Sequence, residues 1–188
     1  QWLKLQSKED CFFFIADYHS LTENFDPKAK RAEIYMLAAE LLALGINPKK
    51  CGFFAQSDAP EVTELTWILN TLVTTARLGR MTQFKEKASR QAKNINVGLF
   101  DYPILMAADI LLYNTDAVPV GDDQVQHVEL CRTLAQRFNR DYGEAFKIPE
   151  VVIRKQGARI MGLDDPTKKM SKSASSPANY IALTDSPE

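Results

Sequence analysis

Hydrophobic residues along this chain alternate between short continuous runs and longer periodic segments. Residues 11–16 form a continuous apolar run, which is typical of a strand buried on both faces of a sheet. Further short runs at residues 51–55, 117–120 and 151–153 indicate three more strands. Strands that alternate with helices predict an α/β fold with a doubly wound parallel sheet, in which ligands bind beyond the carboxyl ends of the strands.

Helical periodicity fills the intervals between these strands. It predicts helices at about residues 29–44, 59–78, 99–113 and 123–138. Asp26 and Pro27 provide an N-cap and a first helical position for the first of them, and Gly45 provides its end. The broad apolar surface of the helix that begins near Pro60 fits either core packing or a subunit interface.

Composition limits the possible classes of protein. With 188 residues, 45% of them hydrophobic and 25% charged, the chain fits one compact globular domain. The net charge of −1 gives no global basic field of the kind that indicates nucleic-acid binding. No apolar stretch reaches the roughly 18 residues that a membrane span needs. Cys11, Cys51 and Cys131 have no paired spacing, so neither a zinc cluster nor a disulfide framework is indicated, and we expect a reducing compartment.

Two lysines flanked by serines stand out near the end of the chain, in the run Lys169-Met170-Ser171-Lys172-Ser173. Ammonium groups on such a loop can bind a polyphosphate and stabilise the charge that builds as pyrophosphate leaves. The alternative is a solvated basic turn. Chance produces these five residues in a chain of this size with a probability on the order of one in ten thousand, so a phosphate-binding loop is the better interpretation.

An acidic residue lies on an otherwise apolar helix face. Tyr102, Met106 and Asp109 are spaced i, i+4 and i+7, so they share that face. A buried carboxylate needs a hydrogen-bond donor, and the indole nitrogen of tryptophan is a donor only. On the residues alone, Asp109 fits this role or a pairing with an arginine or a backbone group.

Two further segments follow predicted strands. In the turn Gly121-Asp122-Asp123-Gln124, glycine permits close backbone approach, and the carboxylates can accept hydrogen bonds from ribose hydroxyls or an ammonium group. Gly-Asp-Asp is also a common turn and helix cap. His19 follows the first strand, where a lone histidine is more often structural than catalytic.

Taken together, these motifs resemble the tryptophanyl branch of the class I aminoacyl-tRNA synthetases, and the resemblance extends over residues 10–179. Residues 169–173 match the second signature of the class. Residues 101–113 resemble the amino-acid-selecting helix of this branch, and residues 118–130 its ATP- and amino-acid-binding segment. One mild departure is Asp122, where many relatives have Glu.

The resemblance implies two sets of site residues. The ATP site would contain Gly121, Asp122, Asp123, Ile160, Lys169, Met170, Ser171, Lys172 and Ser173. The tryptophan pocket would contain His19, Tyr102, Met106, Asp109 and Gln124. Lys169 and Lys172 would act on the phosphates during catalysis. Lys87 would join them, although the alternating charges of residues 81–87 fit an exposed helix start equally well.

The same resemblance implies the reaction and the partners. We expect tryptophan and ATP to give tryptophanyl-AMP and pyrophosphate, followed by transfer of tryptophan to tRNA(Trp). Mg²⁺ would accompany ATP, with no metal held by the protein itself. A homodimer in the cytoplasm, or in an organelle, is the expected state. Residues 1–188 would form the catalytic domain, with the mobile lysine loop inside residues 154–188.

Two features of the family are absent from these 188 residues: the glycine loop with His or Asn that binds ATP, and the helical domain that reads the anticodon. We therefore expect the chain to be a fragment with weak activity or none. Two alternatives stay open. One is a tyrosyl-tRNA synthetase, which shares the lysine loop, and the other is a catalytically silent module that binds tryptophan or a nucleotide.

Overall fold

The chain folds into two compact units, Gln1–Val152 and Ile153–Glu188. The computed structural model describes residues 2–90, 95–153, 160–168, 170, 176–182 and 185. None of the helices within these residues is long and apolar enough to cross a membrane.

In the residues that the structure describes, four strands form two sheets. β1 (Phe12–Ile15) and β2 (Gly52–Ala55) run parallel, with a register that pairs Phe12 with Gly52 and Ile15 with Ala55. β3 (Ala117–Val120) pairs with β4 (Glu150–Ile153) in a second two-stranded sheet. The α/β class and the positions of all four strands are confirmed. The described strands are hydrogen-bonded in two separate pairs. Periodicity does not predict this pairing, because pairing depends on contacts between distant segments.

The burial of β1 differs from its expectation. Ile15 is buried, but Phe12 is 47% exposed, so this strand is not covered on both faces along its whole length. A continuous apolar run does not show which of its residues will be covered, since that depends on the neighbours that the fold brings to each face.

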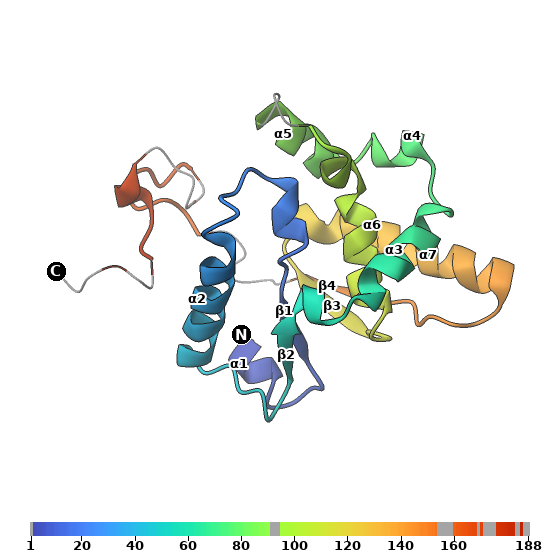
Figure 1. Cartoon of the computed structure of the whole chain (residues 1–188), viewed down its shortest axis with the longest axis horizontal. Coiled ribbons are helices and arrows are strands. Elements are labelled where there is room, and N and C mark those ends of the chain that lie inside the picture. Colours follow the sequence, from blue (N-terminus) through green and yellow to red (C-terminus); the bar gives the residue numbers. More distant parts are fainter. Residues whose placement is uncertain are drawn as a thin grey trace. The chain divides into compact units, whose positions relative to one another are not determined.

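The helices of the described residues include those expected between the strands and, in addition, a short one near the amino terminus that was not predicted (Figure 1). They are α1 (Trp2–Leu5), α2 (Lys30–Ala43), α3 (Glu61–Asn70), α4 (Thr75–Leu78), α5 (Thr82–Arg90), α6 (Val97–Leu111) and α7 (Val125–Tyr142). Short 3-10 turns lie at η1 (His19–Thr22), η2 (Gln56–Asp58), η3 (Asp122–Gln124) and η4 (Pro177–Asn179). The helix expected over 59–78 is two helices, α3 and α4, and the polar segment that follows contains α5.

Both ends of α2 show the contacts that the sequence predicts. Asp26 Oδ1 accepts a hydrogen bond from the Lys28 backbone N–H at 2.9 Å, as an N-cap does, and the Asp26 carbonyl accepts from the N–H groups of Ala29 and Lys30. The regular helix begins at Lys30. At the other end Gly45 adopts φ +104°, and its N–H donates to the Leu42 carbonyl. This left-handed conformation favours glycine and ends the helix as predicted.

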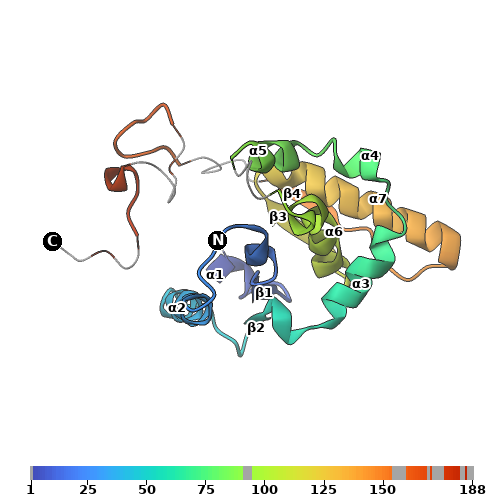
Figure 2. The same cartoon turned by 45° about the horizontal axis from the view of Figure 1, so that its top comes forward.

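Helix α6 is the centre of the larger unit. It packs against α3 and α7, and also against η1, α4 and α5 (Figures 1 and 2). Leu99 and Ile104 of α6, Leu69 of α3 and Val128 of α7 have no exposed surface. Most residues of α6 are apolar and nine of its side chains are buried, so the helix lies in the interior and supports the site described below.

Two large apolar residues of α3 are exposed within the described part of the chain. Val62, Leu65 and Leu69 point into the core, whereas Trp67 is 76% exposed and Ile68 is 43% exposed. The apolar surface seen in the sequence therefore divides into a core-facing part and an outward-facing part. Core packing explains only the first.

Burial of Cys131 predicts an inert thiol. Its side chain is fully buried, and desolvation raises its pKa from 9.0 to about 12. Because the thiolate is the reactive form, alkylation by iodoacetamide at pH 8 should leave Cys131 unmodified in the folded protein and modify it in urea. Cys11, which is only partly buried, is the internal control and should be labelled first. Peptide mass spectrometry measures both sites, and equal labelling of the two in the native protein would contradict the expectation.

Candidate active site

The carboxyl ends of β1 and β2 bring together three polar residues. Because Ile15 and Ala55 are register partners, the residues that follow them leave the sheet side by side. Asp17 and His19 follow β1, and Gln56 follows β2 directly. This is the edge of a parallel sheet at which ligands bind in α/β proteins.

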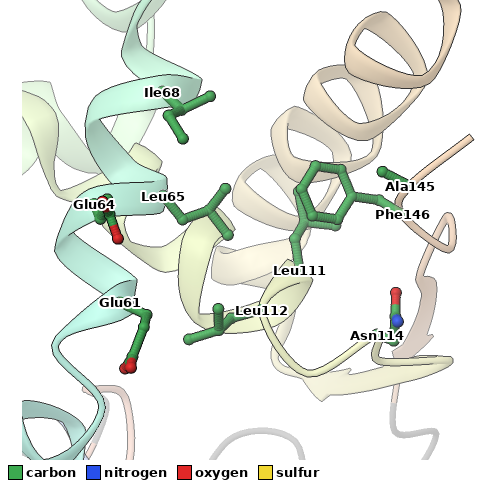
Figure 3. A pocket seen from close by; sticks show the side chains of 9 residues that line it. All are labelled: Glu61, Glu64, Leu65, Ile68, Leu111, Leu112, Asn114, Ala145 and Phe146. Atoms are coloured by element: carbon green, nitrogen blue, oxygen red, sulfur yellow. The ribbon is translucent and has the colours of Figure 1, made fainter. Parts of the chain in front are cut away.

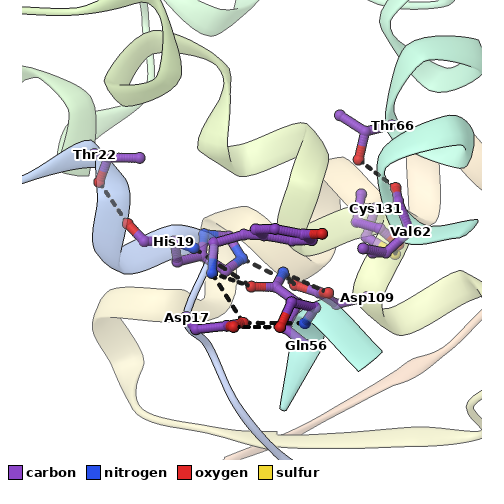
Figure 4. Close-up of polar contacts among 11 residues, drawn as sticks. Asp17, His19, Thr22, Gln56, Val62, Thr66, Asp109 and Cys131 are labelled. Atoms are coloured by element: carbon purple, nitrogen blue, oxygen red, sulfur yellow. Dashed lines mark hydrogen bonds and ion pairs between the residues drawn. The ribbon is translucent and has the colours of Figure 1, made fainter. Parts of the chain in front are cut away.

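Asp109 of α6 meets this edge of the sheet. Its side chain is almost entirely removed from water, and Gln56 Nε2 donates to both carboxylate oxygens, at 2.7 Å to Oδ1 and 2.9 Å to Oδ2 (Figure 4). His19 Nε2 lies 2.9 Å from Asp109 Oδ2. Within the described residues, no Arg or Lys pairs with this carboxylate. The donors that a buried carboxylate needs are thus a neutral amide and an imidazole.

A second set of contacts holds the ends of the two strands together. Asp17 Oδ1 accepts hydrogen bonds from the backbone N–H groups of Ser57, at 3.0 Å, and Tyr18, at 3.1 Å. Ser57 Oγ donates to Asp17 Oδ2 at 2.5 Å. The segment that carries His19 is therefore fixed to the segment that carries Gln56 independently of Asp109.

Tyr102 connects α6 to α7. Its hydroxyl lies 2.9 Å from Nε2 of His127, and both side chains are buried. The His19 ring meets the Tyr102 ring edge-on, with centroids 6.2 Å apart. The structure therefore places His19, Tyr102 and Asp109 of the expected tryptophan pocket in one neighbourhood. Met106 is half-buried on the same helix and packs against the core.

The turn before α7 contains a hydrogen bond between two neighbouring side chains. Asp122 and Asp123 are exposed, and Gln124 Nε2 donates to Asp123 Oδ2 at 2.9 Å. A Cβ at Gly121 would lie 2.8 Å from Asp123 Oδ1, so a larger residue there would displace the Asp123 side chain. Among the described residues, no hydrogen bond joins Gln124 to the Asp109 cluster.

The expected phosphate ligands are described only in part. Lys169, Ser171, Lys172 and Ser173 lie outside the described residues, and so does the side chain of Lys87, which belongs to α5. In the smaller unit, the backbone N–H of Met170 donates to the Ile160 carbonyl at 3.0 Å, so these two predicted ATP-site residues are neighbours.

A charged turn precedes the lysine loop. Hydrogen bonds from the Thr167 side chain and backbone, together with Lys168 at 3.1 Å, lower the pKa of Asp165 to about 2. This carboxylate stays ionised and stabilises the turn throughout the physiological pH range.

Comparison with known proteins identifies the family. The family model for class I tRNA synthetases (W and Y) matches residues 1–188. This chain belongs to the class I tRNA synthetases for tryptophan and tyrosine. The tryptophan–tRNA ligase of Wolinella succinogenes is 57% identical over 187 residues, which are 100% of this chain and 57% of that protein. The chain thus spans little more than half the length of this curated relative.

Solved synthetase structures share the fold. The tryptophanyl-tRNA synthetase from Campylobacter jejuni, complexed with ADP and tryptophan, matches with a TM-score of 0.88 and 42% identity, over 99% of this chain and 56% of that one. The tyrosyl-tRNA synthetase from Aeropyrum pernix matches with a TM-score of 0.71 and 20% identity, over 97% of this chain and 52% of that one. The second likeness concerns the fold alone.

Two residues of this cluster were not found by sequence reasoning. Gln56 contacts Asp109, and His127 contacts Tyr102, yet neither was assigned a role. Gln56 could have been found from its position, since it is the first residue after a predicted strand in a parallel sheet. His127 gives no comparable signal, because its partner is set by the packing of α7 on α6.

A separate cavity of about 270 Å³ lies elsewhere on the synthetase domain (Figure 3). It lies between α3, the end of α6 and the loop at Ala145 and Phe146, and Glu61 and Glu64 are among its lining residues. None of the predicted site residues that the structure describes lines it. In the described part of the chain, no three His, Cys, Asp or Glu side chains form a metal site.

The Tyr102–His127 contact should make a measurable contribution to the free energy of unfolding. Tyr102→Phe removes one buried hydrogen bond while keeping the ring, so the free energy of unfolding should fall by about 1 kcal/mol. Tyr35→Phe is the matched control, because the Tyr35 side chain is exposed and should change the value by less than about 0.5 kcal/mol. Urea unfolding measures both, and equal values for the two variants would show that the contact does not stabilise the fold.

Proposed function

We propose that this chain carries the amino-acid-activating site of a tryptophan–tRNA ligase. The tryptophan carboxylate attacks the α-phosphate of ATP in line, which gives tryptophanyl-AMP and pyrophosphate, and tryptophan then passes to the terminal ribose of tRNA(Trp). The observation that carries the proposal is the burial of Asp109, with Gln56 and His19 as its hydrogen-bond partners, on a predominantly apolar helix.

Asp109 supplies the selectivity in this proposal. A buried carboxylate that is not neutralised by Arg or Lys keeps acceptor capacity for a ligand, and the indole N–H is a donor. Phenylalanine offers no such donor, and sites built on one buried hydrogen bond can discriminate by factors of about 10⁴. The relatives from W. succinogenes and C. jejuni, named for tryptophan, support this substrate over tyrosine.

No side chain needs to act as a nucleophile in this reaction, so the protein contributes positioning and charge stabilisation. The ribose side of ATP would be held by Gly121, Asp122 and Asp123. The adenine side would be held by Ile160 and Met170. The phosphates would be held by Lys87, Lys169 and Lys172. Mg²⁺ would arrive with ATP. The ADP in the C. jejuni structure supports a nucleotide site in this fold.

The oligomeric state and location belong to the same proposal. The exposed Trp67 and Ile68 on α3 support a homodimer, because an uncovered apolar helix face favours burial against a second subunit. We also propose a cytoplasmic location, and one catalytic domain over residues 1–188 with the lysine loop in residues 154–188.

Pyrophosphate exchange tests the proposed reaction. The full-length gene product should convert labelled pyrophosphate into ATP only when tryptophan is present. Dependence on tyrosine instead would identify a tyrosyl enzyme, and binding of tryptophan or ATP without exchange would identify a catalytically silent module.

Replacement of Asp109 tests the recognition of the indole. In the full-length protein, Asp109→Asn should raise the KM for tryptophan about 100-fold and leave the KM for ATP near its original value, because only the amino acid contacts this residue. Asp116→Asn is the matched control, since Asp116 is exposed and pairs with Lys147. An unchanged KM for tryptophan in Asp109→Asn would reject the assigned role.

Replacement of Lys172 tests the phosphate loop. Lys172→Ala should lower kcat for exchange by a factor on the order of 10² to 10³, with little change in tryptophan affinity, because the ammonium group acts on charge that develops during the reaction. Lys147→Ala, on an exposed lysine, is the control. Equal losses in kcat and in tryptophan affinity would reject a role in the transition state.

A further inference from the structure

Gln56 is a buried amide at the meeting point of three elements. Its side chain is 1% exposed, and it follows the last residue of β2 directly. The amide contacts the segment after β1 on one side and α6 on the other. No other described residue hydrogen-bonds to both oxygens of the Asp109 carboxylate.

The contacts of Gln56 fix the orientation of its amide group. Oε1 accepts hydrogen bonds from the backbone N–H groups of Tyr18, at 3.1 Å, and His19, at 3.4 Å. Nε2 donates to Asp109 at 2.7 and 2.9 Å. A rotated amide would place its oxygen against a carboxylate and its NH₂ group against backbone donors, so every contact would be lost.

We propose that Gln56 is a positioning residue that sets the selectivity for tryptophan by orienting Asp109, an inference that rests on the proposed function of this site. A carboxylate offers about four acceptor positions. In the described structure, Gln56 and His19 together take two positions on Oδ2, while Oδ1 accepts from Gln56 alone. The position left on Oδ1 is the one that receives the indole N–H.

The neutrality of Gln56 is central to this role. An arginine at the same place would bind both carboxylate oxygens through charge-assisted hydrogen bonds and neutralise the group. A glutamine holds the plane of the carboxylate and leaves its charge in place, so an incoming N–H donor gains a stronger hydrogen bond. Gln56 therefore orients the acceptor without satisfying it.

The local backbone does not depend on Gln56 alone. Asp17 joins the two strand ends through the Ser57 N–H and hydroxyl groups. Replacement of Gln56 should leave this connection in place, so that the variant folds and its defect appears at Asp109. The role can then be tested by kinetics.

The test compares tryptophan with an isosteric analogue in which sulfur replaces the indole N–H, benzothienylalanine. In pyrophosphate exchange by the full-length gene product, Gln56→Met should raise the KM for tryptophan by a factor on the order of 10 to 100, because a hydrogen bond to a charged group loses its geometry. The KM values for the analogue and for ATP should change less than about threefold. The preference for tryptophan over the analogue should therefore collapse.

Gln6→Met is the matched control. Gln6 is also a buried glutamine whose amide bridges backbone groups, since Nε2 donates to the Gly45 carbonyl and Oε1 accepts from Asn47 N–H, both at 2.9 Å. It loses the same kinds of contact and should keep the preference for tryptophan. Gln56→Glu provides a second variant, because it retains an acceptor for Tyr18 and His19 but removes the donors to Asp109. It should lose the preference as Gln56→Met does.

The outcomes separate this inference from the proposed function. If the unaltered protein and Gln56→Met show the same preference for tryptophan over the analogue, Gln56 does not position Asp109. The same conclusion follows if the KM values for tryptophan and for the analogue rise by equal factors in both Gln56 variants. If the unaltered protein shows no tryptophan-dependent exchange, the proposed function itself fails. A preference that is lost in Asp109→Asn but kept in both Gln56 variants would overturn the inference alone.

Discussion

The burial of one carboxylate constrains the larger unit of this protein. Asp109 is 5% exposed on a predominantly apolar helix, and an unpaired charge in that position would cost several kcal/mol. Its donors come from the ends of two other elements, so β1, β2 and α6 must converge for the fold to be stable. The same convergence creates the proposed recognition site. Stability and selectivity therefore depend on one set of hydrogen bonds.

Helix α6 links this cluster to the proposed nucleotide side. Tyr102 contacts His127 of α7, and α7 begins directly after the turn at Gly121. A closely packed helix keeps the residues along its length at fixed positions relative to one another. The proposed amino-acid pocket and the proposed ribose ligands are thus held by neighbouring elements of one core, which is what a reaction governed by positioning requires.

Particular residues show which features of the structure could be predicted from the sequence. The four strands, the end of α2 at Gly45 and the acid at Asp109 are visible as local patterns, because each depends on nearby residues or on a strong burial rule. The break between α3 and α4 was missed, since intrinsic helix propensities differ by fractions of a kcal/mol and tertiary contacts decide where a helix ends. Gln56 and His127 were missed because their partners are 53 and 25 residues away in the chain.

The sequence by itself determined the α/β class, the order of the elements and the lysine-rich signature, because periodicity and short motifs are properties of adjacent residues. The tertiary structure alone decided which donors complete Asp109 and which apolar face of α3 stays uncovered. These depend on contacts between distant segments, and a carboxylate that must be paired does not specify its partner. Only the register of β1 with β2, and the packing of α6 against their ends, selects Gln56 and His19.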